Sequence, residues 1–492
     1  MIEQKKWDKP VSAKQTQWGQ FGTLVSVFFF WGFVAASNDI LIPVFQKAFT
    51  LSQTQSQLVS IAFYVAYTVG SLIYLGISKA IGDDILNRTG YKNGIAIGLI
   101  ISAVGTLLFI PAANLESFNL MISGLFVVGL GFSLQQIAAN PLAVVMGDPK
   151  TGSQRLSLAG GVNNFGTTIG PLVVSFAIFG KVGSATVASV QSVKMPYLLL
   201  GAAFIAVALF FKFSSVPNKI NLDKVAEDEA ESPAKVAHRS SAFAYPQLWL
   251  GMIAIFTYVG VEVATASNLP AYLEKHLNVP TSDVAPYVSL YWASLMIGRW
   301  TASIGAFDFS DSIKNVLKFV MPFIAFGVFL AVNAFAGHDI TKFFPYAGVI
   351  VALIIGDALS KGSPARMLLI FASMGAVALG IGMATNGMVS VFAFISAGLF
   401  CSTMWPCIFT LAVAGLGKHT NEGSSMLILM ICGGGFVSLL QGFVADHGLG
   451  IHYSYLVGVA CFGYLAFYAY RAGVLLKAQG IDYDVKITGG GH

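Results

Sequence analysis

Long apolar stretches alternate with short polar segments along the whole chain. A helix needs about 20 mostly apolar residues to cross ~30 Å of hydrocarbon at about 1.5 Å per residue. The pattern predicts six membrane-spanning helices before a central polar segment, over 21–48, 56–81, 93–113, 117–147, 155–180 and 195–215. It predicts eight more after that segment, over 246–274, 284–307, 315–336, 343–360, 366–384, 388–416, 422–445 and 451–475.

The polar segments between these helices predict the orientation in the membrane. We expect residues 216–245 to form a cytoplasmic linker, and residues 1–20 and 476–492 to form a cytoplasmic N-terminal segment and tail. This arrangement satisfies the positive-inside rule, which places lysines and arginines in cytoplasmic loops. It leaves outside five of the 28 basic residues: Lys47, Lys181, Lys194, Lys275 and Lys342.

The composition supports this class of protein and excludes others. The 492 residues are 55% hydrophobic and 10% charged, whereas soluble domains have about 25% charged residues. The net charge of +5 lies in loops, so we expect no nucleic-acid partner. The histidines are scattered and no nucleophile–base motif is present, so we expect no enzyme, no cofactor and no resident metal. The four cysteines lie in apolar stretches, which predicts buried free thiols: Cys401, Cys407, Cys432 and Cys461.

The two halves of the chain repeat short motifs in the same order. Ala36-Ser37-Asn38 recurs as Ala266-Ser267-Asn268, and Asn140-Pro141 takes the place that Trp405-Pro406 takes in the second half. Together with matching glycine-rich spans, these repeats predict two related six-helix bundles within 21–215 and 246–475. The repeat leaves residues 310–362 as an inserted transmembrane hairpin, in which we expect Asp357 to be an interfacial acid beside Lys361. A hairpin adds an even number of crossings and leaves the later orientation unchanged.

Two acids stand in otherwise apolar spans, Asp39 and Glu262. An ionisable group at the centre of a membrane helix costs at least ~2.5–3.5 kcal/mol, so it is retained mainly where it serves a cavity, a partner or an ion path. No intramembrane cation is evident as a partner for Asp39, which favours a titrating group over a permanently paired one. Glu262 is a second proton site, a sodium ligand or a substrate acceptor. The two acids predict a cation-coupled transporter and leave H⁺ and Na⁺ open.

Amides and aromatic rings dominate the polar inventory of the spans. Amides match sugar hydroxyls and aromatic faces stack on sugar rings, whereas an anionic substrate would require buried Arg or Lys. Arg299 is the one such candidate, near the cytoplasmic end of its span. A neutral polyhydroxylated substrate is therefore favoured, although amides also hold helices together. The predicted substrate-binding residues are Asn38, Gln135, Gln136, Asn140, Asn163, Asn164, Asn268, Tyr291, Trp292 and Trp405.

Several strings together resemble the fucose–galactose–glucose:cation symporter family of the major facilitator superfamily. They are Asn38-Asp39-Ile40-Leu41-Ile42-Pro43, Ala138-Ala139-Asn140-Pro141, Asn163-Asn164-Phe165-Gly166, Tyr258-Val259-Gly260, Ile297-Gly298-Arg299 and Gly433-Gly434-Gly435 with Gly442-Phe443-Val444-Ala445-Asp446. The resemblance implies the major facilitator fold and a protonation role for Asp39. Gln136, where the fucose branch has a glutamate, and Glu262 resemble the bacterial glucose/galactose branch. Gly160-Gly161 departs from the family pattern by replacing a more polar stretch.

These features predict a secondary transporter in a bacterial inner membrane. We expect a monomer in the lipid bilayer that takes up glucose, galactose or mannose with a cation, H⁺ before Na⁺, by alternating access. The charged loop around Asp83, Asp84 and Arg88 is expected to serve gating between the bundles or orientation in the membrane, and not substrate contact. A proton-driven exporter of drugs or metabolites and a transport-incompetent sugar receptor are the alternatives.

Overall fold

The computed structural model describes residues 16–49, 53–147, 151–179, 191, 194–219, 239–279, 285–307 and 309–481. Within these ranges it describes no side chains at 36–48, 53–60, 171–179, 270, 274, 285 and 447. The described residues form helices and connecting turns, without a strand. The predicted all-α fold is therefore confirmed.

The first half of the chain consists of helices α1 to α8. Their bounds are α1 Trp18–Ala48, α2 Gln53–Ile81, α3 Ile85–Thr89, α4 Tyr91–Leu107, α5 Phe109–Asn114, α6 Phe118–Val145, α7 Gly152–Phe179 and α8 Lys194–Phe213. Apart from the short α3 and the α4–α5 break, each long helix coincides with one predicted span.

The second half runs from η3 to α20. It begins with η3 Ala242–Ala244, α10 Pro246–Leu277, α11 Ala285–Ser303, η5 Ile304–Ala306, α12 Asp311–Phe335, η6 Thr341–Tyr346, α13 Ala347–Ser360 and α14 Pro364–Ala384. It continues with α15 Gly387–Cys401, α16 Met404–Val413, η7 Gly417–His419, α17 Thr420–Leu429, η8 Met430–Cys432, α18 Gly433–Val444, η9 Ala445–Leu449, α19 Gly450–Tyr453 and α20 Leu456–Ala478.

Most of these helices can cross a bilayer. Twelve segments of the described chain are long and apolar enough to do so. The helices α7 and α11, of 28 and 19 residues, are long enough to cross a bilayer but are not among those twelve. Fourteen crossings is therefore an approximate count that includes these two helices.

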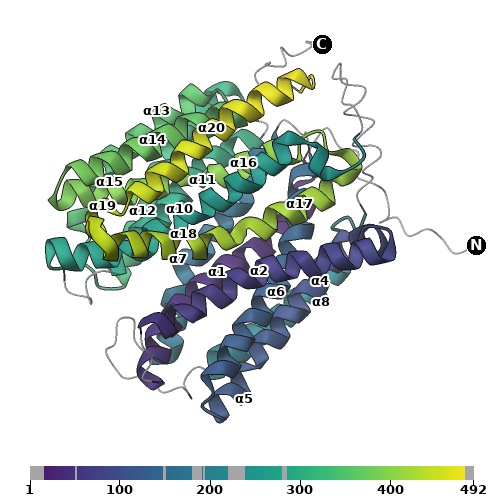
Figure 1. The fold of residues 1–492 in the computed structure, drawn as a ribbon, viewed down its shortest axis with the longest axis horizontal. Helices are drawn as coiled ribbons and strands as arrows, with labels where there is room; N and C mark the ends of the chain where they lie inside the picture. Colours follow the sequence, from purple (N-terminus) through teal and green to yellow (C-terminus); the bar gives the residue numbers. More distant parts are fainter. Residues whose placement is uncertain are drawn as a thin grey trace, which may run out of the picture.

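Helix packing follows the sequence repeat. In the first half α1 packs against α7, α2 against α6, and α4 against α6 and α8. In the second half α10 packs against α18, α11 against α15, and α14 against α15 and α20. In Figure 1 the purple and blue helices of the first half lie below the green and yellow helices of the second. The two bundles therefore use equivalent contacts, helix by helix.

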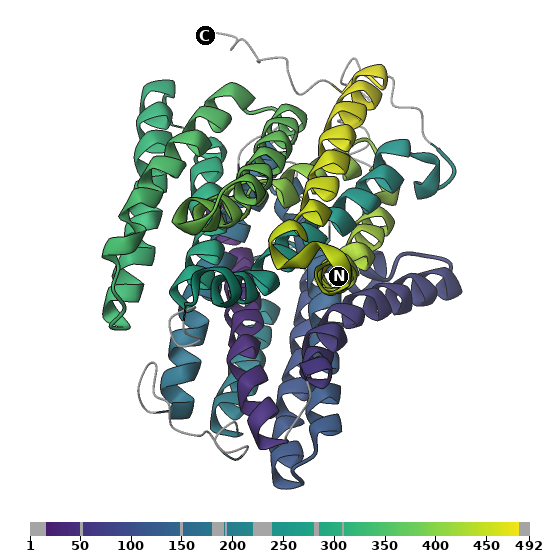
Figure 2. The ribbon, with the colours of Figure 1, turned by 60° about the vertical axis from the view of Figure 1, so that its left-hand side comes forward.

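Among the described residues of the first half, no helices correspond to α12 and α13. The helix α12 packs against α11, and α13 packs against α14, so the pair is attached to the outside of the second bundle. Figure 2 places its green helices at the outer edge of the molecule. An ion pair of 2.7 Å between Lys318 Nζ on α12 and the buried Asp357 carboxylate on α13 joins the two helices.

Several helices begin or end on one side of the molecule, close to contacts between the two bundles. We call it the proximal side: α1 begins there and α20 ends there, and a 3.0 Å hydrogen bond from Gln479 to Gln247 joins the end of α20 to the start of α10. The starts of α4, α7 and α17 and the end of α11 lie on this side too, as Tyr91 at the start of α4 bonds Asn421 at the start of α17.

Candidate transport site and bundle interface

Several of the described candidate residues lie about 15 Å from the proximal ends of their helices or near the middle of them. Gln136 lies nine residues before the end of α6, and Asn163 lies eleven residues after the start of α7. At about 1.5 Å per residue both positions are roughly 15 Å from the proximal helix ends, half of a ~30 Å hydrocarbon layer. Glu262 is halfway along α10, and Tyr291 is twelve residues before the end of α11. Side chains from both bundles thus share one depth.

Two of the α6 candidates are fully buried. Gln135 accepts a 2.7 Å hydrogen bond from the Trp31 indole and donates a 3.0 Å bond to Ser102. Its amide therefore joins three helices of the first bundle. Asn140 is also buried, and its Nδ2 has no hydrogen-bond partner among the described residues. An unsatisfied buried donor is costly, which makes Asn140 a buried amide with a donor available to a ligand.

The other candidates of the first bundle are half-buried. Gln136 donates a 3.2 Å hydrogen bond to the Tyr67 hydroxyl, and Asn163 donates a 2.9 Å bond to the Phe28 carbonyl oxygen. Each bond uses only part of what a side-chain amide can donate and accept. Gln136 and Asn163, both partly exposed, thus keep unused hydrogen-bonding capacity at mid-depth.

In the second bundle a carboxylate is held by two tyrosines. The Tyr258 hydroxyl donates to Glu262 Oε2, one turn further along α10, and the Tyr291 hydroxyl on α11 donates a 2.8 Å bond to the Glu262 carbonyl oxygen. Both tyrosines are buried, whereas Glu262 is half-buried. The half-buried Trp405 lies beside Tyr258, with 6.2 Å between the ring centroids. Trp292 makes an edge contact with Tyr291 at 5.5 Å.

The first contact between the bundles, which we call the Arg299 seam, joins α7 to α11. Arg299 is buried and donates from Nη1 to Asn164 Oδ1 at 2.8 Å and to the Gly160 carbonyl oxygen at 3.3 Å. The next residue, Trp300, donates from its indole to the Gly161 carbonyl oxygen at 3.1 Å. A Cβ atom on Gly161 would lie 2.7 Å from Trp300 Cδ1. The two glycines therefore permit this close approach.

Arg299 also holds its own bundle together. Its Nε donates a 3.0 Å bond to the Ser402 carbonyl oxygen, and its Nη2 donates a 3.2 Å bond to the Tyr258 hydroxyl. Ser402 lies at the break between α15 and α16, where a backbone carbonyl is free of the regular helix pattern. The guanidinium thus bonds α7, α10 and the α15–α16 break at once.

The second contact, which we call the Ser425 seam, joins α17 and its surroundings to the first bundle. Ser424 donates to the Ile137 carbonyl oxygen at 3.3 Å and Ser425 to the Ser71 carbonyl oxygen at 3.4 Å. Thr68 donates to the Leu429 carbonyl oxygen at 2.9 Å. Nearer the proximal side the Tyr91 hydroxyl donates to Asn421 Oδ1. Hydroxyl groups and an amide make these bonds, and none involves a charged side chain.

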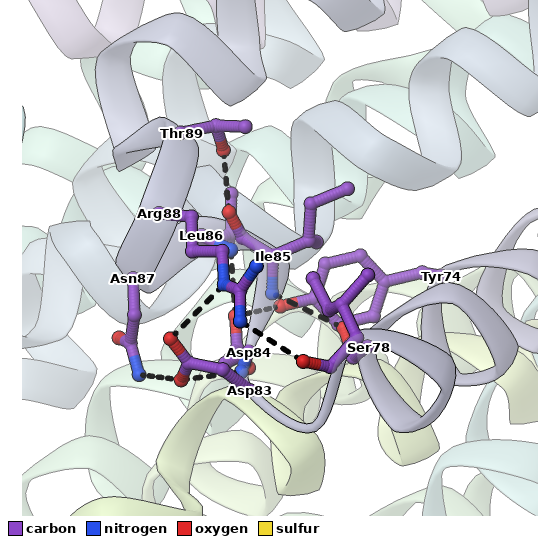
Figure 3. Close-up of polar contacts among 10 residues, drawn as sticks. Tyr74, Ser78, Asp83, Asp84, Ile85, Leu86, Asn87, Arg88 and Thr89 are labelled. Atoms are coloured by element: carbon purple, nitrogen blue, oxygen red, sulfur yellow. Dashed lines mark hydrogen bonds and ion pairs between the residues drawn. The ribbon is translucent and has the colours of Figure 1, made fainter.

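Two neighbouring acids after α2 have opposite environments (Figure 3). Asp84 caps α3 by accepting from the Leu86 amide at 2.7 Å, and it accepts from the Tyr74 hydroxyl at 2.6 Å. Burial raises the pKa of Asp84, opposed by hydrogen bonds from Tyr74, Leu86 and Asn421. Asp83 is exposed, and the Asn87 hydrogen bond comes first among the causes that lower its pKa. The loop predicted to serve gating therefore reaches the bundle interface through Asp84.

The remaining predicted residues fall elsewhere. The side chains of Asn38 and Asp39 lie outside the described part of α1. Asn268 donates to the Ala264 carbonyl oxygen of its own helix at 2.8 Å. Asn164, predicted to contact substrate, is buried and engaged by Arg299.

Sequence reasoning missed the network that connects these groups. Tyr258 and Arg299 were noted as parts of short family-like strings, and Arg299 also as a possible ligand for anions, but neither was connected to Glu262. The sequence feature that could have indicated this network is Gly160-Gly161. These two small residues lie opposite the large residues Arg299 and Trp300. Tyr74, Tyr91 and Asn421 carried no sequence signal beyond their polarity.

Comparisons with known proteins place this architecture in a family. The model of the Major Facilitator Superfamily matches residues 21–356. The glucose/galactose transporter of Brucella abortus biovar 1 (strain 9-941) is 36% identical over 449 residues, which are 91% of this chain and 92% of that protein. The L-fucose-proton symporter of Escherichia coli (strain K12) is 28% identical over 483 residues, 94% of this chain and 95% of that protein.

Solved structures agree with the family match. A crystal structure of the transporter FucP in the outward conformation superimposes with a TM-score of 0.68 at 26% identity, covering 92% of this chain and 98% of that one. The chain belongs to the major facilitator superfamily. It is a multi-pass membrane protein and a transporter, and its resemblance to the fucose–galactose–glucose branch is confirmed.

Proposed function

We propose that this protein is a secondary active transporter that takes up a neutral hexose together with a cation. Glucose, galactose or mannose is the expected sugar and H⁺ the expected ion, with Na⁺ as the alternative. The observation that carries the proposal is the half-buried Glu262 at mid-depth, bonded by Tyr258 and accompanied by half-buried amides and indoles from both bundles. The named activities of the two relatives support the sugar class.

The proposal assigns places in the membrane and in the chain. The proximal side is the cytoplasmic side of a bacterial inner membrane, with both termini cytoplasmic. Residues 21–215 and 246–475 form the two bundles, 216–245 the linker and about 310–362 the inserted hairpin. Residues 1–20 and 476–492 are the cytoplasmic ends. The transporter works as a monomer.

The mechanism follows alternating access. Sugar enters from the periplasmic side and meets Gln136, Asn140 and Asn163 on one bundle and Trp292 and Trp405 on the other. A proton neutralises Asp39 and Glu262, which removes the cost of carrying their charge through the membrane. The bundles then rock, the Arg299 and Ser425 seams part, and sugar and proton leave on the cytoplasmic side. The driving force is about 2.3 kcal/mol per charge per 100 mV plus any concentration gradient.

The test is uptake of radiolabelled glucose into proteoliposomes under an imposed proton gradient and, separately, a sodium gradient. Galactose, mannose and fucose serve as competitors. We expect accumulation under the proton gradient, lost in Asp39→Asn and in Glu262→Gln while sugar counterflow persists. Asp311→Asn, which removes an exposed acid at the start of α12, is the matched control and keeps accumulation.

Other outcomes have definite meanings. Accumulation under the sodium gradient alone would reassign the ion. Absence of hexose uptake and counterflow under both gradients would overturn the sugar assignment and favour a proton-driven exporter. Retained accumulation in both acid variants would overturn their coupling role.

A further inference from the structure

Arg299 and Glu262 are connected by a single hydroxyl group. Arg299 Nη2 donates to the Tyr258 oxygen, and the same hydroxyl donates its proton to Glu262 Oε2. Neither Lys nor Arg lies within 4.0 Å of the Glu262 carboxylate among the described residues, so the guanidinium reaches it through Tyr258. The charge of Glu262 therefore bears on the orientation of Arg299.

The opposite end of the same guanidinium closes the bundle interface. Nη1 is bound to Asn164 and to the Gly160 carbonyl oxygen, both on α7. These partners belong to the first bundle, whereas Tyr258, Glu262 and Ser402 belong to the second. Arg299 thus bonds Tyr258, the hydrogen-bond partner of Glu262, through one nitrogen and bonds α7 across the seam through another.

We propose that Arg299 is a positioning residue that transmits the charge state of Glu262 through Tyr258 to the Arg299 seam. The proposal rests on the proposed coupling role of Glu262. With Glu262 ionised, the guanidinium has a nearby counter-charge and stays in the closed seam. When Glu262 takes up a proton, Arg299 is a buried cation without that counter-charge, which is costly. Parting of the seam relieves the cost by hydrating Arg299.

The surroundings of Glu262 contain few other groups that could take over this role. In the described part of the chain the charged and titratable groups near it are Arg299 and Tyr291 on α11, Cys401 on α15 and Tyr258 on α10 itself. Tyr291 bonds the backbone oxygen of Glu262 and not its carboxylate. Arg299 is the one cation of this set, and it is the one member bonded to α7.

A substrate bound beside Trp405 would meet the same relay. The Trp405 ring lies 6.2 Å from the Tyr258 ring, so a sugar stacked on the indole adjoins the phenol that joins the acid to the arginine. Proton and sugar thus act on one connection.

The experiment reads opening of the seam without using sugar. Gln154 lies at the proximal start of α7, donates to the Gly362 carbonyl oxygen at 3.4 Å and packs against Gly305. A Gln154→Cys background protein in proteoliposomes is labelled with a maleimide from the proximal side. Peptide-resolved mass spectrometry reads position 154 alone, so the four native cysteines stay in place.

We expect the labelling rate to rise about tenfold as the pH falls from about 8 to about 5.5. A change of this size corresponds to the loss of one hydrogen bond to a charged group. Tyr258→Phe keeps the ring but removes the hydroxyl, and we expect its labelling rate to be independent of pH. Glu262→Gln should label at the acid rate at every pH. Arg299→Lys keeps the charge but cannot span Tyr258 and Asn164 together, so we expect a smaller pH ratio.

Trp300→Phe is the matched control. It removes the neighbouring bond to Gly161, which has no connection to Glu262, so labelling should rise at every pH with an unchanged pH ratio. A wild-type pH ratio in Tyr258→Phe or Glu262→Gln would overturn the proposal, as would a wild-type background that labels equally at all pH values. Glu262→Gln, which preserves side-chain shape, decides the question if Tyr258→Phe does not fold.

This readout separates the relay from the transport function. A protein that transports no hexose but shows the predicted labelling pattern would retain the relay and lose the proposed sugar. Proton-coupled hexose uptake with pH-independent labelling would retain the function and refute the relay.

Discussion

The two seams occupy equivalent places in the repeat but are built differently. In the Arg299 seam a buried guanidinium bonds an amide and a backbone oxygen across two glycines. In the Ser425 seam, serine and threonine hydroxyls bond backbone oxygens at 2.9 to 3.4 Å. Hydrogen bonds with a charged partner are worth about 1.5–3 kcal/mol and neutral ones about 0.5–1.5. The comparison suggests one seam held by a buried charge and one held mainly by neutral groups.

The largest effect is expected when a larger residue replaces Gly161, which leaves space for the Trp300 ring in the Arg299 seam. Gly161→Val places methyl groups against the Trp300 ring, and overpacking of this kind costs about 1–3 kcal/mol. We expect the seam to open at every pH, with faster maleimide labelling at position 154 and loss of gradient-driven uptake. Gly435→Val is the control because a Cβ there has nothing within 4 Å. Equal effects of the two variants would refute a special role for this gap.

The next effect concerns the proximal end of the Ser425 seam. Tyr91→Phe leaves the buried Asn421 Oδ1 without its donor, which costs about 1–3 kcal/mol. We expect a lower melting temperature in detergent at every pH, because neither partner of the lost bond is charged. The size of the loss should vary only as the pH passes through the titration of Asp84, which lies beside Asn421. An unchanged melting temperature would show that this bond does not hold the seam.

A smaller effect comes from the acids before α3. Burial raises the pKa of Asp84, so its ionised form costs stability above that pKa, and the cost disappears as the pH falls through it. Asp84→Asn keeps the cap and should raise stability at neutral pH by less than about 1 kcal/mol after solvent screening. The gain should vanish in acid, as melting curves across pH would show.

Asp83, the residue before Asp84, is expected to affect the stability in the opposite direction. Its pKa is lowered, chiefly by the Asn87 hydrogen bond, so its ionised form stabilises the protein at neutral pH. That contribution is lost as the pH falls through the lowered pKa. Asp83→Asn should therefore reduce the melting temperature at neutral pH and match the wild type in acid. The same sign for both variants would contradict the assignment of burial to Asp84.

The smallest effect is expected for Ser425→Ala. It removes a 3.4 Å bond to a helix carbonyl oxygen, worth less than about 0.5 kcal/mol at that length. Uptake and labelling at position 154 should match the wild type. Ser438→Ala, which removes a bond within α18, provides the baseline. A large loss in Ser425→Ala alone would mean that the neutral seam also limits the transport cycle.

The sequence predicted the helices well because a bilayer demands continuous apolar length. The span expected over 117–147 is α6 at Phe118–Val145, and the break between bundles falls where the charge is concentrated. The roles of neighbouring amides could not be predicted in this way. Gln135 and Gln136 differ by one residue, yet about 100° of helix rotation places one in the packing and leaves the other half-buried.

The bundle interface was beyond sequence reasoning for a different reason. Arg299 bonds residues 135 and 139 positions away in the chain, and one sequence carries no signal for such distant pairs. Composition identified Arg299 as an intramembrane cation, but its partners follow only from how α7 meets α11. The roles of Asp39 and Glu262 in coupling remain predictions.

The hairpin of α12 and α13 changes how the protein meets its lipids. Its outer surface exposes Val316, Phe319 and Ile324, so the second bundle displaces a wider ring of acyl chains than the first. The proposed rocking motion would therefore move unequal amounts of lipid on its two sides. A mismatch between hydrophobic length and bilayer thickness costs fractions of a kcal/mol per Å. The thickness of the bilayer should therefore affect the equilibrium between the outward-open and inward-open states chiefly through the second bundle, which contacts more lipid.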